Sequence, residues 1–363
     1  MKNNFFRRKL LALFTVLILG IQSRMTAQDL ESQIDQILET KFESNGPGAV
    51  FLVAKNGKII YDKAFGLSNL ELQAPMQTDN VFEIGSMTKQ FTAVSILMLM
   101  EEGKLNLEDE ITQYIPDYPT QGHRITIHHL LTHTSGIKDF TKVNGLNTIA
   151  QNHMEPMEII NFFKNEPMDF APGEAFKYNN SGYVILGYIV EKASGMSYED
   201  FVEQHIFKKL GMSSSRYASH SEMVSKRASG YSKREDYSNA RYISFSIPYA
   251  SGALMSTVAD MLTWQEAIKN HVLLNKETTQ MAFANYTLNN GEPIHYGYGW
   301  HIKELDSKLS YEHGGSIFGF KSMGVYLPKE DIYVIGLSNC DCNSPTEVTR
   351  EIAKLVLNND QMD

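Results

Sequence analysis

Cysteine is scarce in this sequence, which has only Cys340 and Cys342 among 363 residues. Two sulfurs alone make a poor metal site. Side chains two residues apart in an extended strand point the same way, without the ring geometry that a relaxed disulfide prefers. We therefore expect two free, buried thiols, and the pattern assigns them no role.

Several motifs are missing as well. The sequence has no G-x-S-x-G, no G-x-G-x-x-G and no Walker-type loop. Their absence removes the α/β-hydrolases, the dinucleotide-binding proteins and the P-loop nucleotide-binding proteins. We expect no cofactor and no metal. Internal repeats, low-complexity tracts and long linkers are also absent, so residues 28–363 should form one catalytic unit.

The chain is poor in positive charge, with a formal net charge of −9. Residues 1–27 resemble a secretory signal peptide: basic residues precede a mostly apolar run, Leu10 to Ile21, and a polar stretch reaches Ala27. All the charged residues that cleavage removes are basic, so the mature chain is more acidic. A more acidic chain repels nucleic acid and anionic lipid. We expect an exported bacterial protein, periplasmic or secreted, with a small-molecule or peptide substrate and no membrane span after cleavage. A retained membrane anchor is the alternative, and the oligomeric state stays open.

Strand patterns gather at both ends of the mature chain. The runs PGAVFLVAK and KIIYDKAFG are joined by Asn56-Gly57, which is a hairpin signal. Near the other end, GYGWHI, KLSYEH, FKSMGVYL and DIYVIGLSN are typical of short strands. An amphipathic helix at 30–38 precedes the first hairpin, and a final helix starts at Ser344 as N-cap with Pro345 in its first turn.

The middle of the chain is mainly helical, with helices expected near 126–133, 156–164, 181–193, 198–210 and 257–269. The economical architecture is an α+β fold. Residues 28–102 and about 245–363 would contribute a central antiparallel sheet flanked by helices. Residues 103–244 would form an inserted, mainly helical part, with a cleft between the two.

The segment GSMTKQ places Ser86 and Lys89 at the start of the apolar run FTAVSILMLM. Positions i and i+3 share a helix face, so Lys89 would point back toward the Ser86 hydroxyl. A serine needs a neighbouring base, and burial beside a helix N-terminus lowers the pKa of a lysine. The same spacing recurs at Ser135 and Lys138, with a glycine inside it and no apolar helix behind it, so we interpret that copy as a turn.

Two further segments supply polar groups. In FKYNNSGY, Tyr178 and Asn180 are two apart in an extended loop, so a phenol for proton transfer and an amide for holding a substrate can both face a cleft. Helix capping by an asparagine is the alternative. At the end of KLSYEH, His313 is followed by two glycines, the second being Gly315, and by Ser316, whose N–H could join that of Ser86 in an oxyanion hole. A plain β-turn is the alternative there.

The order Ser-x-x-Lys, Tyr-x-Asn, His-x-Gly resembles the serine β-lactamase and penicillin-binding-protein superfamily, in its class C β-lactamase and DD-peptidase branch. The resemblance covers roughly residues 37–356 and includes VFEIGSMTK, LLTHTSGI, APGEAFKYNNSGY and SGALMSTVAD. It implies a β-lactamase/transpeptidase-like fold and a serine hydrolase that cleaves an amide or ester, with D-amino-acid peptides or small esters as substrates.

The resemblance also implies the roles of the site residues. Ser86 would attack a carbonyl and form an acyl-enzyme, Lys89 and Tyr178 would share the proton transfers, Asn180 would orient the substrate, and His313 would line the opposite wall. Which of Lys89 and Tyr178 is the base stays open.

One departure from the pattern bears on activity. Class C β-lactamases carry Lys-Thr-Gly where this chain has His313-Gly314-Gly315. A histidine is often neutral at pH 7, whereas a lysine brings a fixed charge for a substrate carboxylate. β-Lactam hydrolysis is therefore an alternative function. Lys321 or Arg241 could supply the missing cation, and Trp300, Phe318 and Phe320 could make part of the pocket apolar.

Two rival interpretations remain. His129 and His133 are four apart, with His128 adjacent, as in zinc proteases, but Leu130 stands where those enzymes have a glutamate. A noncatalytic penicillin-binding or sensor protein could also keep the pocket and lose turnover.

Overall fold

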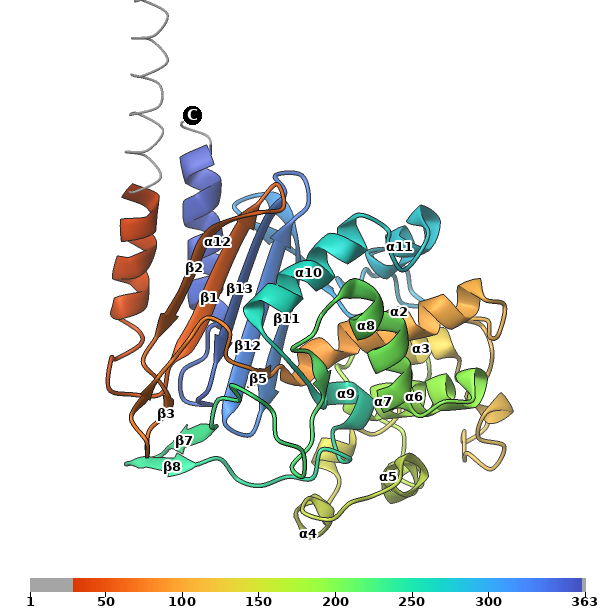
Figure 1. Cartoon of the computed structure of the whole chain (residues 1–363). Coiled ribbons are helices and arrows are strands. Elements are labelled where there is room, and N and C mark those ends of the chain that lie inside the picture. The colour runs from red at the N-terminus through yellow and green to blue at the C-terminus, as the bar shows by residue number, and fades with distance from the viewer. Residues whose placement is uncertain (1–28, 361–363) are drawn as a thin grey trace, which may run out of the picture.

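The computed structural model describes residues 29–360, so the signal peptide predicted at 1–27 lies outside them. A six-stranded antiparallel sheet, in the order β10-β11-β12-β13-β1-β2, forms its centre (Figure 1). Its strands are β1 (Ala49–Lys55), β2 (Lys58–Phe65), β10 (His301–Leu305), β11 (Lys308–Ile317), β12 (Phe320–Leu327) and β13 (Ile332–Ser338). The expected sheet built from both chain ends is confirmed, since β1 pairs with β13.

The hairpins follow their turn residues. Asn56 and Gly57 both have positive φ, 50° and 70°, as the tight turn between β1 and β2 requires. GYGWHI is a strand only from His301 onward. The strand begun by KLSYEH is longer than predicted, because β11 continues to Ile317. The glycine motif therefore lies inside a strand and not in a turn.

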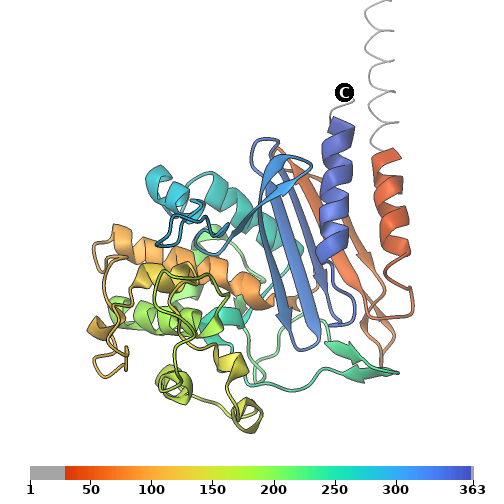
Figure 2. The same ribbon diagram turned by 180° about the vertical axis from the view of Figure 1, so that it is seen from behind.

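Two helices cover one face of the sheet (Figure 2). They are the helix at residues 29–39 and α12 (Thr346–Asp360), the first and last helices of the described chain. Ile34 and Leu38 from the first helix and Ile352 from α12 pack with Phe51 and Val53 of β1 in one apolar layer. The two ends of the chain are thus held together by burial of apolar surface.

The remaining helices lie on the opposite face. They are α2 (Thr88–Glu101), α3 (Ile127–Leu131), α4 (Leu146–Ile149), α5 (Pro156–Phe163), α6 (Asn180–Ser194), α7 (Tyr198–Val202), the π-helical η4 (Glu203–Phe207), α8 (Lys208–Leu210), α9 (Tyr249–Gly252), α10 (Val258–Lys269) and α11 (Lys276–Ala282). Residues 88–99 of α2 are all buried, so this helix is apolar around most of its circumference and occupies the centre of the helical layer. Between residues 29 and 360, no helix is both long and apolar enough to span a membrane.

Short elements connect these layers. The 3-10 turns are η1 (Gly85–Met87), η2 (Ile111–Gln113) and η3 (Phe140–Lys142). The minor strands are β3 (Leu67–Asn69), β4 (Ala74–Pro75), β5 (Phe82–Glu83), β6 (Arg216–Tyr217), β7 (Tyr231–Lys233), β8 (Tyr237–Asn239) and β9 (Leu254–Ser256). Strand β9 pairs with β5 and β6, which brings segments far apart in the sequence beside η1.

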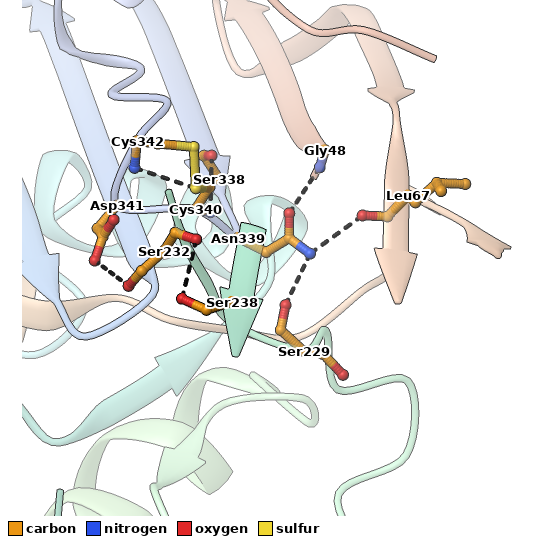
Figure 3. Close-up of a disulfide and its surroundings, with 10 residues drawn as sticks. All are labelled: Gly48, Leu67, Ser229, Ser232, Ser238, Ser338, Asn339, Cys340, Asp341 and Cys342. Atoms are coloured by element: carbon orange, nitrogen blue, oxygen red, sulfur yellow. Dashed lines mark hydrogen bonds between the residues drawn. A yellow bond between two sulfur atoms is a disulfide. The ribbon is translucent and has the colours of Figure 1, made fainter. Parts of the chain in front are cut away.

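The prediction of two free thiols is wrong, because Cys340 and Cys342 form a disulfide (Figure 3). Strand β13 ends at Ser338, and the chain then turns, so the alternation of a strand does not apply to these residues. The turn brings their Cα atoms to 5.0 Å, within the usual disulfide range. Asn339 anchors the turn, since its Oδ1 accepts a hydrogen bond from the Gly48 N–H at 2.7 Å.

Candidate active site

Ser86 lies in η1, the single 3-10 turn that connects β5 to α2. Its side chain is partly exposed, and the turn packs directly on β11. Gly85 has a φ of 52°, and a Cβ on it would lie 2.8 Å from the Ser316 backbone nitrogen. Only glycine combines this conformation with this close approach. The contact places the Ser316 N–H beside the turn that carries Ser86.

Gly315, in β11, is required because this strand packs closely against the residue before Gly85. A Cβ on Gly315 would lie 2.0 Å from the Ile84 carbonyl oxygen. The same oxygen accepts a hydrogen bond from the Ser322 hydroxyl of β12 at 2.8 Å. The glycine motif therefore lets β11 and β12 hold the residue that precedes Gly85-Ser86.

Lys89 is the second residue of α2, and its side chain has no exposed surface. Its Nζ lies 3.2 Å from the Ser86 Oγ, 2.8 Å from the Asn180 Oδ1 and 2.8 Å from the Ser251 carbonyl oxygen. All three partners are neutral. Burial lowers the pKa of Lys89 to about 7, although the negative charge of Asp139 acts in the opposite direction. The site therefore holds an amine that is largely neutral just above pH 7.

Asn180 is fixed from both ends of its amide. Its Oδ1 faces Lys89, and its Nδ2 donates to the Asp139 Oδ2 at 3.0 Å. The Asn180 backbone N–H donates to the same oxygen at 3.1 Å. Capping of α6 is done by Asn179, whose side chain accepts a hydrogen bond from the Gly182 N–H. The capping alternative thus applies to Asn179, which leaves Asn180 for the site.

Tyr178 places its ring against the lysine. The Lys89 Nζ lies 4.8 Å from the centroid of this ring. The Tyr178 hydroxyl is buried and has no hydrogen-bond partner among residues 29–360. Burial is the main cause that raises the pKa of the Tyr178 phenol above its ordinary value. The phenol is therefore protonated at neutral pH and can act as a proton donor.

His313 lies behind Tyr178, and it does not line the cavity at Ser86. It is 2% exposed, and its ring centroid is 6.0 Å from that of Tyr178. Its Nδ1 donates to the Gly314 carbonyl at 2.6 Å, which leaves Nε2 to accept from the Tyr296 hydroxyl at 3.2 Å. Burial holds the pKa of His313 well below its usual range, so the ring is neutral. The His313 ring therefore lies beside that of Tyr178, outside the lining of the cavity at Ser86.

A cavity of about 600 Å³ opens at Ser86. Asn180, Ser316 and Lys321 line it, and so does the half-exposed Phe318. The other candidates for this pocket lie elsewhere. Trp300 and Phe320 are buried in the core, and the Arg241 guanidinium donates to the Asn147 side chain at 3.0 Å.

The residues of the rival interpretations have separate partners. The His128 Nδ1 contacts the Tyr298 hydroxyl, the His129 Nδ1 contacts Thr126, and the His133 Nδ1 accepts from the Asn179 N–H. Residues 29–360 contain no group of three histidine, cysteine or acidic side chains placed to hold a metal ion. In the second Ser-x-x-Lys copy, Lys138 forms an ion pair with Asp169 at 2.8 Å.

Two groups of the site were not identified from the sequence. Asp139 is buried and organises Asn180 through two hydrogen bonds. It is the second residue after LLTHTSGI, and only its nearness to that segment could have singled it out. Ser251 contributes a backbone carbonyl, for which side-chain motifs give no signal.

The chain matches proteins of one family along nearly its whole length. The family model described as Beta-lactamase matches residues 28–358. Penicillin-binding protein 4* of Bacillus subtilis (strain 168) is 31% identical over 343 residues, which are 90% of this chain and 75% of that protein.

Solved structures share the fold. The penicillin binding protein from Bacillus halodurans is 28% identical, with a TM-score of 0.76 over 89% of this chain and 98% of that one. D-amino acid amidase from Ochrobactrum anthropi SV3 is 23% identical, with a TM-score of 0.78 over 92% and 99%, and at that identity it shows the fold alone. The chain belongs to the beta-lactamase family and is a serine hydrolase of the β-lactamase and penicillin-binding-protein type.

Proposed function

We propose that this protein is an exported serine hydrolase that forms an acyl-enzyme on Ser86 and cleaves an amide or ester bond, with short D-amino-acid peptides as the favoured substrates and small esters as the second class. The observation that carries the proposal is the buried Lys89 amine, which has a pKa of about 7 and lies 3.2 Å from the Ser86 Oγ.

The contacts of Lys89 orient its lone pair. A neutral amine has two N–H donors and one lone pair. The Asn180 Oδ1 and the Ser251 carbonyl oxygen can only accept, so they take the two donors at 2.8 Å each. The lone pair is then left for the third neighbour, the Ser86 hydroxyl. This arrangement supports Lys89 as the general base that an unassisted serine needs.

The reaction follows from this geometry. Ser86 Oγ bonds to the substrate carbonyl carbon while its proton passes to the Lys89 Nζ. The N–H groups of Ser86 and Ser316 stabilise the resulting oxyanion. The carbon–nitrogen or carbon–oxygen bond of the substrate then breaks, and the leaving group takes a proton from the Lys89 ammonium, either directly or through Tyr178, which gives up its own proton and receives that of Lys89. Water hydrolyses the ester on Ser86, which releases the acid and restores the serine.

Two alternatives have less support. β-Lactam hydrolysis as the main activity would use a cation at the position of His313, which is neutral and buried. A protein that bound its ligand without covalent attack would have no need for a buried lysine of lowered pKa, because such burial costs stability. For export, the predicted signal peptide and the Cys340–Cys342 disulfide are support, since disulfides persist in oxidising compartments.

The test is covalent labelling of the wild type and of Ser86→Ala with a fluorophosphonate and a fluorescent penicillin, followed by identification of the labelled peptide. We expect label on Ser86 from at least one reagent and none in the variant. Ser135→Ala is the matched control, because it changes the other Ser-x-x-Lys serine and should keep the label. Equal labelling of Ser86→Ala and wild type contradicts the proposal.

A further inference from the structure

Among residues 29–360, only two side chains of charged type line the cavity at Ser86. They are Lys321, on β12, and Asp341, in the turn after β13. The remaining lining is neutral and largely apolar, with Phe140, Leu146, Ile243 and Phe318 among its members. The cavity therefore offers a ligand one cation and one anion on an otherwise uncharged surface.

Lys321 lies close to the reacting serine. In the sheet register it stands opposite Ser316 on one side and Ser338 on the other. Its Nζ donates to the Ser316 hydroxyl at 2.7 Å. It forms no ion pair with a carboxylate of residues 29–360, so its charge is available to a ligand beside the Ser316 N–H.

Asp341 is held by its neighbours but keeps one oxygen free. Its Oδ2 accepts a hydrogen bond from the Ser232 hydroxyl at 2.6 Å (Figure 3). Its N–H donates to the Tyr231 carbonyl at 3.1 Å. The disulfide between the residues on either side of it closes the turn. No lysine or arginine between residues 29 and 360 lies at ion-pair distance, and the Oδ1 has no hydrogen bond within that range.

Because β12 and β13 are adjacent, both charges lie at the same end of the sheet. Asp341 follows Ser338, the register partner of Lys321, by three residues. The two side chains do not pair with each other, although opposite charges at contact distance would attract. Each is left to be neutralised by a group that enters the cavity.

We propose that Lys321 and Asp341 select a dipolar substrate, whose carboxylate binds Lys321 beside Ser316 and whose ammonium group binds Asp341. This inference rests on the proposed function and narrows its substrate class to short peptides with a free amino group and a free carboxylate. A cavity of about 600 Å³ suits a ligand of this size. The disulfide keeps Asp341 in position.

The test compares four forms of one dipeptide, D-alanyl-D-alanine: unblocked, N-acetylated, C-amidated and doubly blocked. Hydrolysis is followed by mass spectrometry with wild type, Lys321→Met and Asp341→Asn. Asp341→Asn should raise the KM of the forms with a free amine roughly tenfold and leave the N-acetylated forms unchanged. Lys321→Met should raise the KM of the forms with a free carboxylate to a similar extent and leave the C-amidated forms unchanged. The kcat should change little in both.

Controls separate charge selection from damage to the fold. Lys329→Met and Asp236→Asn change exposed residues of the same types and should alter no KM. Equal KM values for all four forms in the wild type, or a variant that raises KM for blocked and free forms alike, would overturn the inference. Fluorophosphonate labelling of Ser86 is measured in parallel. If wild type takes no label on Ser86, the proposed function is wrong. If Ser86 is labelled but KM does not depend on the charges of the dipeptide, only this inference is wrong.

Discussion

The chain contains Ser-x-x-Lys twice, and its two lysines lie in opposite environments. Lys89 is completely buried, contacts only neutral acceptors and has a pKa lowered to about 7. Lys138 forms an ion pair with Asp169, and this hydrogen bond raises the pKa of Lys138 above its ordinary value. The three-residue spacing is the same in both copies, so the spacing alone does not turn a lysine into a base. What turns Lys89 into a base is the burial of its amine without an ion-pair partner.

The two serines also differ in their environments. Ser86 is partly exposed at the mouth of a cavity. Ser135 is buried, and its hydroxyl accepts a hydrogen bond from the Ile137 N–H at 3.3 Å, which stabilises a local turn. A nucleophile needs both an activating base and access to substrate, and only the first copy has the two together.

The largest expected effect distinguishes the serines. Ser86→Ala should lower kcat/KM for a chromogenic ester by roughly 10⁴-fold or more, because the bond-forming atom is gone. Ser135→Ala should stay within about threefold of wild type, because the Ser135 hydroxyl is buried, does not line the cavity and accepts from the Ile137 N–H. Steady-state kinetics with circular dichroism as a folding control measure both. A comparable loss in the two variants would break the comparison.

The lysines come next. Lys89→Met should lower kcat by about 10²- to 10⁴-fold, the usual contribution of a general base. Lys138→Met should leave kcat near wild type, because the Lys138 amine pairs with Asp169 and not with Ser86. The covalent reagent used on Ser86 should react slowly with Lys89→Met and at the normal rate with Lys138→Met. If Lys89→Met retained full turnover, Tyr178 would have to be the base.

The partner carboxylates give a smaller and more specific effect. Asp139 raises the pKa of Lys89 by its negative charge, so Asp139→Asn should lower that pKa. In wild type, kcat/KM should rise as pH increases through about 7, where Lys89 loses its proton. The acidic limb of this profile should move to lower pH in Asp139→Asn, with roughly tenfold lower maximal activity because Asn180 loses its anchor. Asp169→Asn should leave the profile in place.

The smallest expected effect is on stability. The unfolded chain keeps the lysine pKa near 10.5, whereas the folded protein lowers it to about 7. Between these values the unfolded state binds one more proton, so the free energy of unfolding should rise with pH. Relative to Lys89→Met, wild type should therefore gain stability from pH 7 to 10, by at most about 1.4 kcal/mol per pH unit. Denaturant unfolding at several pH values measures this, and a flat difference would contradict it.

Local patterns predicted much of the fold because they act over short distances. Asn56-Gly57 set a hairpin by its backbone conformation, and the apolar run after Lys89 predicted a buried helix. The disulfide was missed because the strand predicted at DIYVIGLSN ends at Ser338, two residues before Cys340. The end of a strand is poorly marked in sequence. The glycine motif was assigned to the end of a strand for the same reason.

The site was predicted in part because its residues fall in three recognisable segments. The structure brings Ser86, Lys89, Tyr178 and Asn180 together, and places the Ser316 N–H beside them. Tertiary contacts decide the rest. No local pattern shows that the Ser251 carbonyl faces Lys89.

The central claim is that the Lys89 amine loses its proton near pH 7, whereas the Lys138 amine stays protonated well above that pH. An NMR titration of the protein with ¹³C-labelled lysine Cε, with the two signals assigned by their loss in Lys89→Met and Lys138→Met, tests it directly. The account predicts that Lys89 titrates near pH 7 and Lys138 above its ordinary range. A Lys89 signal that shows a charged amine up to pH 10 would contradict the account.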